Sequence, residues 1–134
     1  MELLIVVAII LIIATIAIPS LLRSRQAAQE TAAVATLRMM NTAEVTYSSA
    51  AGSVYGTVSQ LLGAGLIDSS LTNVKAGYNY GVQLSANGLD FTATATAATS
   101  LMGRYDYDST PDYLIRYSTD TTRAPNGLTG LPIR

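Results

Sequence analysis

The feature that most constrains this chain is an uncharged run from Leu3 to Leu22, built almost entirely of Leu, Ile, Val and Ala. As an α-helix, about 20 residues span roughly 30 Å, the thickness of one bilayer core. A core helix of a small soluble protein would carry a polar face, and this run has none. The run therefore predicts a helix that needs lipid or other apolar helices around it.

A cleaved signal peptide is the plain alternative for an apolar run near the start of a chain. Three features argue against it: no basic segment precedes the run, no small-residue cleavage signal interrupts it, and the helical pattern continues after Pro19. A simple membrane anchor has the same length requirement and stays open. Orientation also stays open: Arg23 and Arg25 would place their end in the cytoplasm, but a basic leader upstream would reverse this balance.

A second helical segment follows the apolar run. Residues 20–51 are rich in helix formers and contain neither Gly nor Pro, and Gly52 is a natural terminator. Together the two segments predict one helix about 75 Å long, which a compact chain with a radius of gyration of about 14 Å cannot contain. Part of the helix must therefore protrude, and Pro19 is expected to kink or loosen it.

The second segment also carries a stripe that needs a partner surface. Its apolar residues recur at spacings of three, four and seven, as on one face of a helix. They are Ala33, Val34, Leu37, Met40, Ala43 and Tyr47, whereas Arg38, Asn41 and Thr42 lie largely off the stripe.

The remaining chain predicts a connector and a β-rich head. Thr57-Val58-Ser59-Gln60 matches a capping box and predicts a short helix, ended by Gly63 and Gly65. From Ala76 onward the apolar residues alternate with polar ones, which predicts antiparallel strands on which the amphipathic helix packs. The four expected strands lie at 78–85, 89–96, 104–107 and 113–118; Asn87-Gly88 and Ser109–Asp112 are expected turns, and 119–134 an irregular tail.

The fold class is therefore α+β, with a long, half-protruding helix packed on a four-stranded antiparallel sheet. The chain divides into a protruding helix (1–22), an amphipathic helix (23–52), a connecting segment with a short helix (53–75) and the β head with its tail (76–134).

Composition narrows the function classes. The chain has no Cys and no His, which excludes disulfides, the usual zinc sites and catalysis by either side chain. We find no nucleophile–base pair, metal cluster or phosphate-binding glycine loop, and therefore expect neither an enzyme nor a cofactor. The net charge of −1 offers no reason to expect a nucleic-acid partner.

Two weaker hypotheses concern the head. Asp106, Asp108 and Asp112 are candidate calcium ligands, since hard cations take several carboxylates, but the spacing of a known loop motif is missing. Cross-strand ion pairs with Arg104 and Arg116 are the alternative. The eight tyrosines suggest packing in the core rather than conduction along stacked rings.

Glu2, the apolar run after it and Pro19 resemble, in residue type and spacing, the N-terminus of mature type IV pilins and the related pseudopilins. The layout of long helix, connector and antiparallel sheet resembles the pilin fold. The family's leader peptide, cleavage-site glycine and N-methylated phenylalanine are absent, so we expect the mature chain to begin upstream of Met1. Leu11 replaces a helix-loosening glycine of many pilins, and their C-terminal cysteine pair is also missing.

The resemblance implies a subunit that polymerises into a type IV pilus-like filament through its apolar helix. Glu2 would pair with the N-terminal amine of a neighbouring subunit, and Pro19 would mark where the helix loosens. The residues expected to pack between subunits are Leu3, Leu4, Val7, Ile10 and Leu11. The implied partners are identical subunits, the prepilin peptidase and the pilus assembly machinery; the implied location is the bacterial inner membrane and then the cell surface. The alternatives are a pseudopilin of a type II secretion or DNA-uptake system, or a membrane-anchored binding domain.

Overall fold

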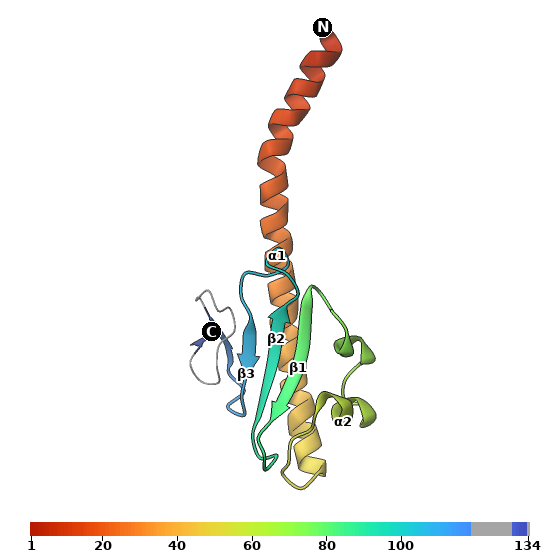
Figure 1. Ribbon diagram of the computed structural model, residues 1–134, viewed down its shortest axis with the longest axis vertical. Coiled ribbons are helices and arrows are strands. Elements are labelled where there is room, and N and C mark those ends of the chain that lie inside the picture. The colour runs from red at the N-terminus through yellow and green to blue at the C-terminus, as the bar shows by residue number, and fades with distance from the viewer. Residues whose placement is uncertain (119–129, 134) are drawn as a thin grey trace.

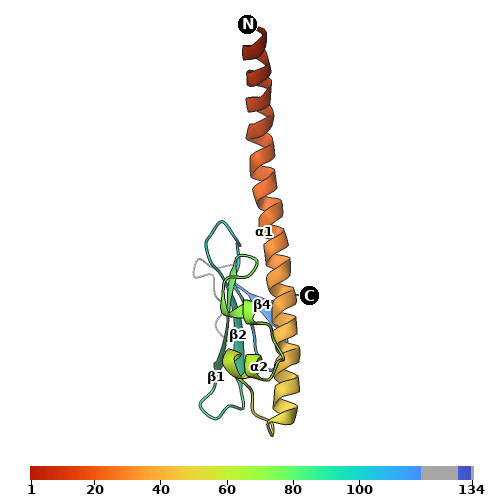
Figure 2. The same ribbon diagram turned by 90° about the vertical axis from the view of Figure 1, so that its right-hand side faces the viewer.

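The computed structural model describes residues 1–118 and 130–133. Helix α1 (Glu2–Ala50) is a single helix of 49 residues that runs through Pro19. Its N-terminal half projects from the head as a gently curved rod, and its C-terminal half lies along the sheet (Figures 1 and 2). The predicted single long helix is confirmed. It ends as expected, because Gly52 takes the left-handed conformation, with φ +74°.

Within the described residues, the head is a five-stranded antiparallel meander in the order β1-β2-β3-β4-β5. The strands are β1 (Tyr78–Leu84), β2 (Phe91–Ala97), β3 (Tyr107–Ser109), β4 (Ile115–Tyr117) and β5 (Leu131–Pro132). The prediction of four strands was therefore wrong by one. Part of the expected irregular tail pairs with β4, with Leu131 opposite Tyr117; residues 119–129 and 134 of that tail lie outside the described residues.

The predicted positions of the third and fourth strands also need correction. Strand β3 begins at Tyr107, not at Arg104, because the backbone and side chain of Arg104 turn to Glu30 on α1. It then runs through Ser109, which was assigned to a turn but pairs with Ala93 and Ile115.

Strand β4 is shorter than predicted at its start. Tyr113 has a φ of 59° and its amide donates to Thr110 O, so Tyr113 belongs to the β3–β4 turn and not to a strand. The second strand was likewise placed too early, because Leu89 lies in the β1–β2 loop and β2 starts at Phe91.

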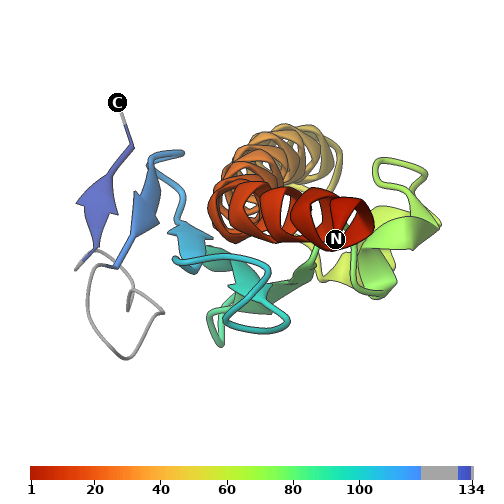
Figure 3. The same cartoon turned by 90° about the horizontal axis from the view of Figure 1, so that it is seen from above.

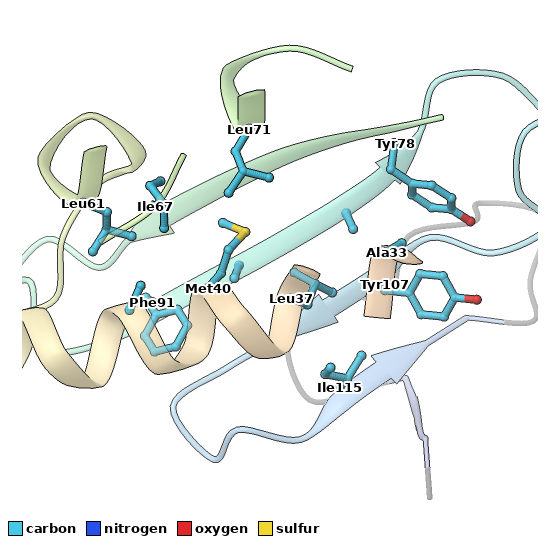
Figure 4. Close-up of a cluster of buried hydrophobic side chains, with 13 residues drawn as sticks. Ala33, Leu37, Met40, Leu61, Ile67, Leu71, Tyr78, Phe91, Tyr107 and Ile115 are labelled. Carbon is cyan, nitrogen blue, oxygen red and sulfur yellow. The ribbon is translucent and has the colours of Figure 1, made fainter. Parts of the chain in front are cut away.

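The core lies between the sheet and one face of α1. Ala33, Leu37 and Met40 of the predicted stripe are buried, and Figure 4 shows the last two pointing toward the strands. They meet residues from every other layer of the head: Leu61, Ile67, Leu71, Tyr78, Phe91, Ala93, Ala95, Tyr107 and Ile115. Viewed along the rod, α1 covers one face of the sheet, with α2 and β5 toward opposite sides (Figure 3).

The connector closes one side of this core. Helix α2 (Val58–Gly63) has the predicted capping box: Thr57 Oγ1 accepts from the amide of Gln60, and Gln60 Oε1 accepts from that of Thr57. After α2 the chain forms a 3₁₀ helix, η1 (Ser69–Thr72), capped by Asp68. Each of these helices places one leucine in the core, Leu61 from α2 and Leu71 from η1.

Candidate assembly surface

The N-terminal half of α1 is an apolar rod with no covering layer in the described chain. Its most hydrophobic stretch of 18 residues has a mean hydropathy of 3.0 and is 0% buried, so this helix is long and apolar enough to cross a membrane. Burying a large aliphatic side chain contributes about 1.5–3 kcal/mol. The rod as a whole therefore favours an apolar environment by on the order of 20 kcal/mol, before the cost of ordering.

The residues predicted to pack between subunits all lie on this rod and are exposed. Their helical spacing of one, four, seven and eight places them on one face: Leu3, Leu4, Val7, Ile10 and Leu11. The other faces are equally apolar and exposed, as Ile9, Ile13 and Ile16 show. A rod that is apolar all round suits an environment that surrounds it, such as lipid or a bundle of like helices.

Glu2 begins the rod as its one acidic residue. Its side chain is exposed. In hydrocarbon or in a dry helical bundle, such a carboxylate needs a cationic partner to offset its lost hydration. The position of Glu2 therefore suits a pairing role within an assembly.

The hydroxyl of Thr15 donates to Ile12 O at 2.7 Å within the rod, so it needs no partner in an apolar environment. Pro19, in contrast, has no N–H to offer the carbonyl of Thr15. A shallow groove beside it is lined by the small residues Ala17, Ser20 and Ser24 together with Ile18 and Leu21. Pro19 thus combines a weakened turn with a place where another helix can approach closely.

Two buried acidic residues tie the other half of α1 to the head. Glu30 accepts three hydrogen bonds from Arg104, from its backbone N–H at 2.8 Å, Nε at 3.1 Å and Nη2 at 3.0 Å. Glu44 is wholly buried and accepts from the amide of Gly56 at 2.9 Å. Burial raises the pKa of Glu44, and the Gly56 hydrogen bond offsets part of that rise.

The sequence interpretation did not identify these acids, although a signal was present. Glu30 and Glu44 extend the spacing of Ala33, Leu37 and Met40 by three and four residues, so they belong to the same buried face. Asn41, predicted to lie off that face, is also buried, because its amide donates to Ser109 Oγ at 2.8 Å. The helix is therefore joined to the head by polar contacts at Glu30, near the rod, and at Asn41 and Glu44, about one helical turn apart toward its other end.

The three aspartates proposed for calcium have different surroundings. Asp106 Oδ1 accepts from the amide of Ala97, and Asp112 pairs with Arg116, which lowers the pKa of Asp112 to about 2. Asp108 is 1% exposed, and neither of its oxygens has a hydrogen-bond partner among residues 1–118 and 130–133. Over the same residues, no group of three acidic side chains is placed to hold a metal ion.

Among the salt bridges of the described residues neither expected cross-strand pair is present: Arg116 pairs with Asp112 of the turn before its own strand, and Arg104 pairs with Glu30 of α1. Burial raises the pKa of Asp108 to about 6, although Arg116 opposes that rise.

The tyrosines pack mainly inside the head. Tyr78 and Tyr107 are buried with ring centroids 6.0 Å apart, and Tyr105 and Tyr117 lie 5.1 Å apart. Tyr78 also donates its hydroxyl hydrogen to Tyr105 O at 2.8 Å. The prediction that tyrosines serve the core is confirmed for Tyr78 and Tyr107.

Comparisons with protein-family models, with curated proteins and with solved structures found no match to this chain. The candidate surface therefore stands on its own geometry: an exposed apolar rod, an acidic residue at its start, and a head rigidly joined to its other end.

Proposed function

We propose that this chain is the structural subunit of a type IV pilus-like extracellular filament, held in the inner membrane before assembly. The observation that carries the proposal is the rod, which is apolar on all faces and 0% buried over its 18-residue window. Such a surface needs an apolar environment, and the head of the same chain does not supply one. Lipid supplies it before assembly, and the rods of other subunits supply it in the filament.

The two environments make the transfer between them feasible. Both hide the same apolar surface, so moving a subunit from lipid into a bundle of rods does not oppose the hydrophobic effect. Glu2 then sets the axial register, because a subunit in the wrong position leaves its carboxylate buried without a cation. Leu3, Leu4, Val7, Ile10 and Leu11 form the packing face in this arrangement.

The head suits a subunit whose rods gather at the filament centre. Glu30 and Glu44 fasten the head to α1 at two levels, so that the head follows the rod as one body. Rods that gather in the middle therefore carry their heads to the outside. A prepilin peptidase and an assembly machinery, which the resemblance to pilins implies, complete the proposed pathway.

Assembly of the purified chain tests the proposal. The full chain is purified in detergent, the detergent is removed, and the material is imaged by electron microscopy. We expect fibres a few nanometres wide. Val7→Asn with Ile10→Asn should abolish them, because each substitution buries an amide in the bundle, whereas Leu89→Asn in the exposed β1–β2 loop is the matched control. Dispersed single subunits from the unaltered chain would contradict the proposal and favour a membrane-anchored binding domain.

A further inference from the structure

The end of the head from which the rod emerges carries an exposed apolar tip. The loop between β2 and β3 makes a tight turn in which the amide of Met102 donates to Thr99 O at 3.0 Å. Leu101 lies at the tip of this turn and is 75% exposed. Figure 1 shows the loop beside α1, at the end of the head nearest the rod.

This loop is held against α1 at a defined height. Gln26 Nε2 donates to Ser100 O at 3.3 Å, and four residues further along α1 Glu30 binds Arg104. On the other side of the loop, Gly77, the residue just before β1, packs so closely on Met102 that a Cβ there would lie 2.9 Å from Met102 Cβ. The position of Leu101 is therefore set by the head and not by a free loop.

That height coincides with a membrane surface if the rod spans the bilayer. Gln26 follows the last residue of the apolar run, Leu22, by only about 6 Å along the helix axis. The polar headgroup region extends roughly 5–8 Å beyond the hydrocarbon core on each side. Ser100 and Leu101 thus lie at the level of the lipid headgroups.

The charges around the loop suit anionic lipid. Arg23 and Arg25 are exposed just beyond the apolar run, and Arg23 shares the helix face of Gln26 and Glu30 by its spacing of three and seven. Lys75 lies at the same end of the sheet through its bridge to Tyr78. The acids nearby are Glu30 and Asp106, both buried with partners, and Asp68, which caps η1.

We propose that the β2–β3 loop docks on the anionic lipid surface, with Leu101 inserted at the headgroup level and Arg23 and Arg25 bound to lipid phosphates. This docking deepens the proposed membrane storage and depends on it. It holds the head upright on the bilayer until the rod is withdrawn into a filament, when Leu101 leaves the lipid.

The absence of native cysteine allows a direct test, because one introduced Cys is a unique site for a fluorescent probe. Three full-length variants are reconstituted into phosphatidylcholine vesicles with and without phosphatidylglycerol, and quencher-bearing lipids report contact. The variants are Ile10→Cys in the rod, Leu101→Cys in the docking loop, and Leu89→Cys, an exposed leucine at the opposite end of the head.

We expect lipid quenching of the probes at positions 10 and 101 and little at 89, with phosphatidylglycerol increasing the quenching at 101. Arg23→Gln and Arg25→Gln should each weaken docking by about fivefold without affecting position 10. If the probe at position 10 is quenched but the probe at position 101 is quenched no more than the one at position 89, the docking is overturned while membrane storage stands. An unquenched probe at position 10 would contradict the proposed membrane storage, and therefore also the docking that depends on it. Shielding of the probe at 101 only in assembled fibres would instead assign the loop to a contact between subunits and overturn the lipid docking.

Discussion

The backbone N–H of Gly56 donates a hydrogen bond of 2.9 Å to Oε2 of Glu44, a carboxylate that is wholly buried in the head. The bond joins the last turns of α1 to the start of the connector. It satisfies an amide that the packing of Tyr47 and Leu61 around Gly56 hides from water. Burying a carboxyl group for this purpose is costly, so the contact indicates where the head is sensitive to substitution.

Glu44→Ala should destabilise the head by about 2–4 kcal/mol, because it leaves the Gly56 amide unsatisfied and opens a cavity. Glu44→Gln should destabilise the head less than Glu44→Ala, since an amide oxygen still accepts the Gly56 bond, although the amide NH2 then occupies the place of Oε1, which has no hydrogen-bond partner among the described residues. Val45→Ala, at an exposed neighbour, is the control. Denaturant unfolding in detergent micelles measures the stability of all three variants. Equal losses of stability in Glu44→Ala and Glu44→Gln would contradict the role of Glu44 as the acceptor for the Gly56 amide.

Asp108→Asn should stabilise the head near neutral pH. Burial raises the folded-state pKa of Asp108 to about 6 from an ordinary value of 3.8, so ionisation costs the folded state up to about 3 kcal/mol at pH 7. Because the folded pKa is the higher one, this residue favours folding fully below pH 3.8, and its contribution is lost as the pH rises through 6.

The pH profile separates Asp108 from its neighbour. Arg116 holds the pKa of Asp112 at about 2, so Asp112 contributes stability above pH 3.8 that is lost as the pH falls toward 2. Unfolding curves for the unaltered chain, Asp108→Asn and Asp112→Asn between pH 2 and 7 should show these opposite slopes. If Asp108→Asn keeps the same slope between pH 4 and 6 as the unaltered chain, the assignment is wrong.

Glu2→Gln should reduce filament yield at least tenfold while leaving insertion into the membrane unchanged. The substitution keeps the size of the side chain and removes the charge that we propose sets the register between subunits. Sedimentation and electron microscopy of detergent-free preparations measure the yield. Asp90→Asn, at an exposed acid in the β1–β2 loop, should assemble normally. Abundant, regular fibres from Glu2→Gln would count against the buried pair.

Pro19→Ala should tighten α1. An amide at position 19 restores the hydrogen bond to the Thr15 carbonyl that proline lacks. Hydrogen exchange at the amides within one turn of position 19 should slow by roughly tenfold, as expected for about 1.4 kcal/mol of added local stability. Ser20→Ala should leave the exchange unchanged, and the same exchange rates in all three proteins would show that Pro19 is not a weak point.

Much of the architecture could be read from local patterns. The capping box at Thr57, the alternation in β1 and the terminator at Gly52 each depend on residues within one or two turns of chain, and the structure has all three. The ends of the strands could not be predicted as well from local patterns. Arg104 leaves the sheet for Glu30, which lies 74 residues away in the sequence, and no local rule contains that contact.

The sequence by itself determined the rod, because a run of apolar residues without a polar face excludes water whatever the rest of the chain does. Tertiary structure alone decided which polar groups became internal. Glu44, Asn41 and Asp108 are buried because distant segments close over them, and their partners and pKa values follow from that closure. Apolar character belongs to each residue and adds along the chain, whereas burial of a polar group depends on which remote atoms come to surround it.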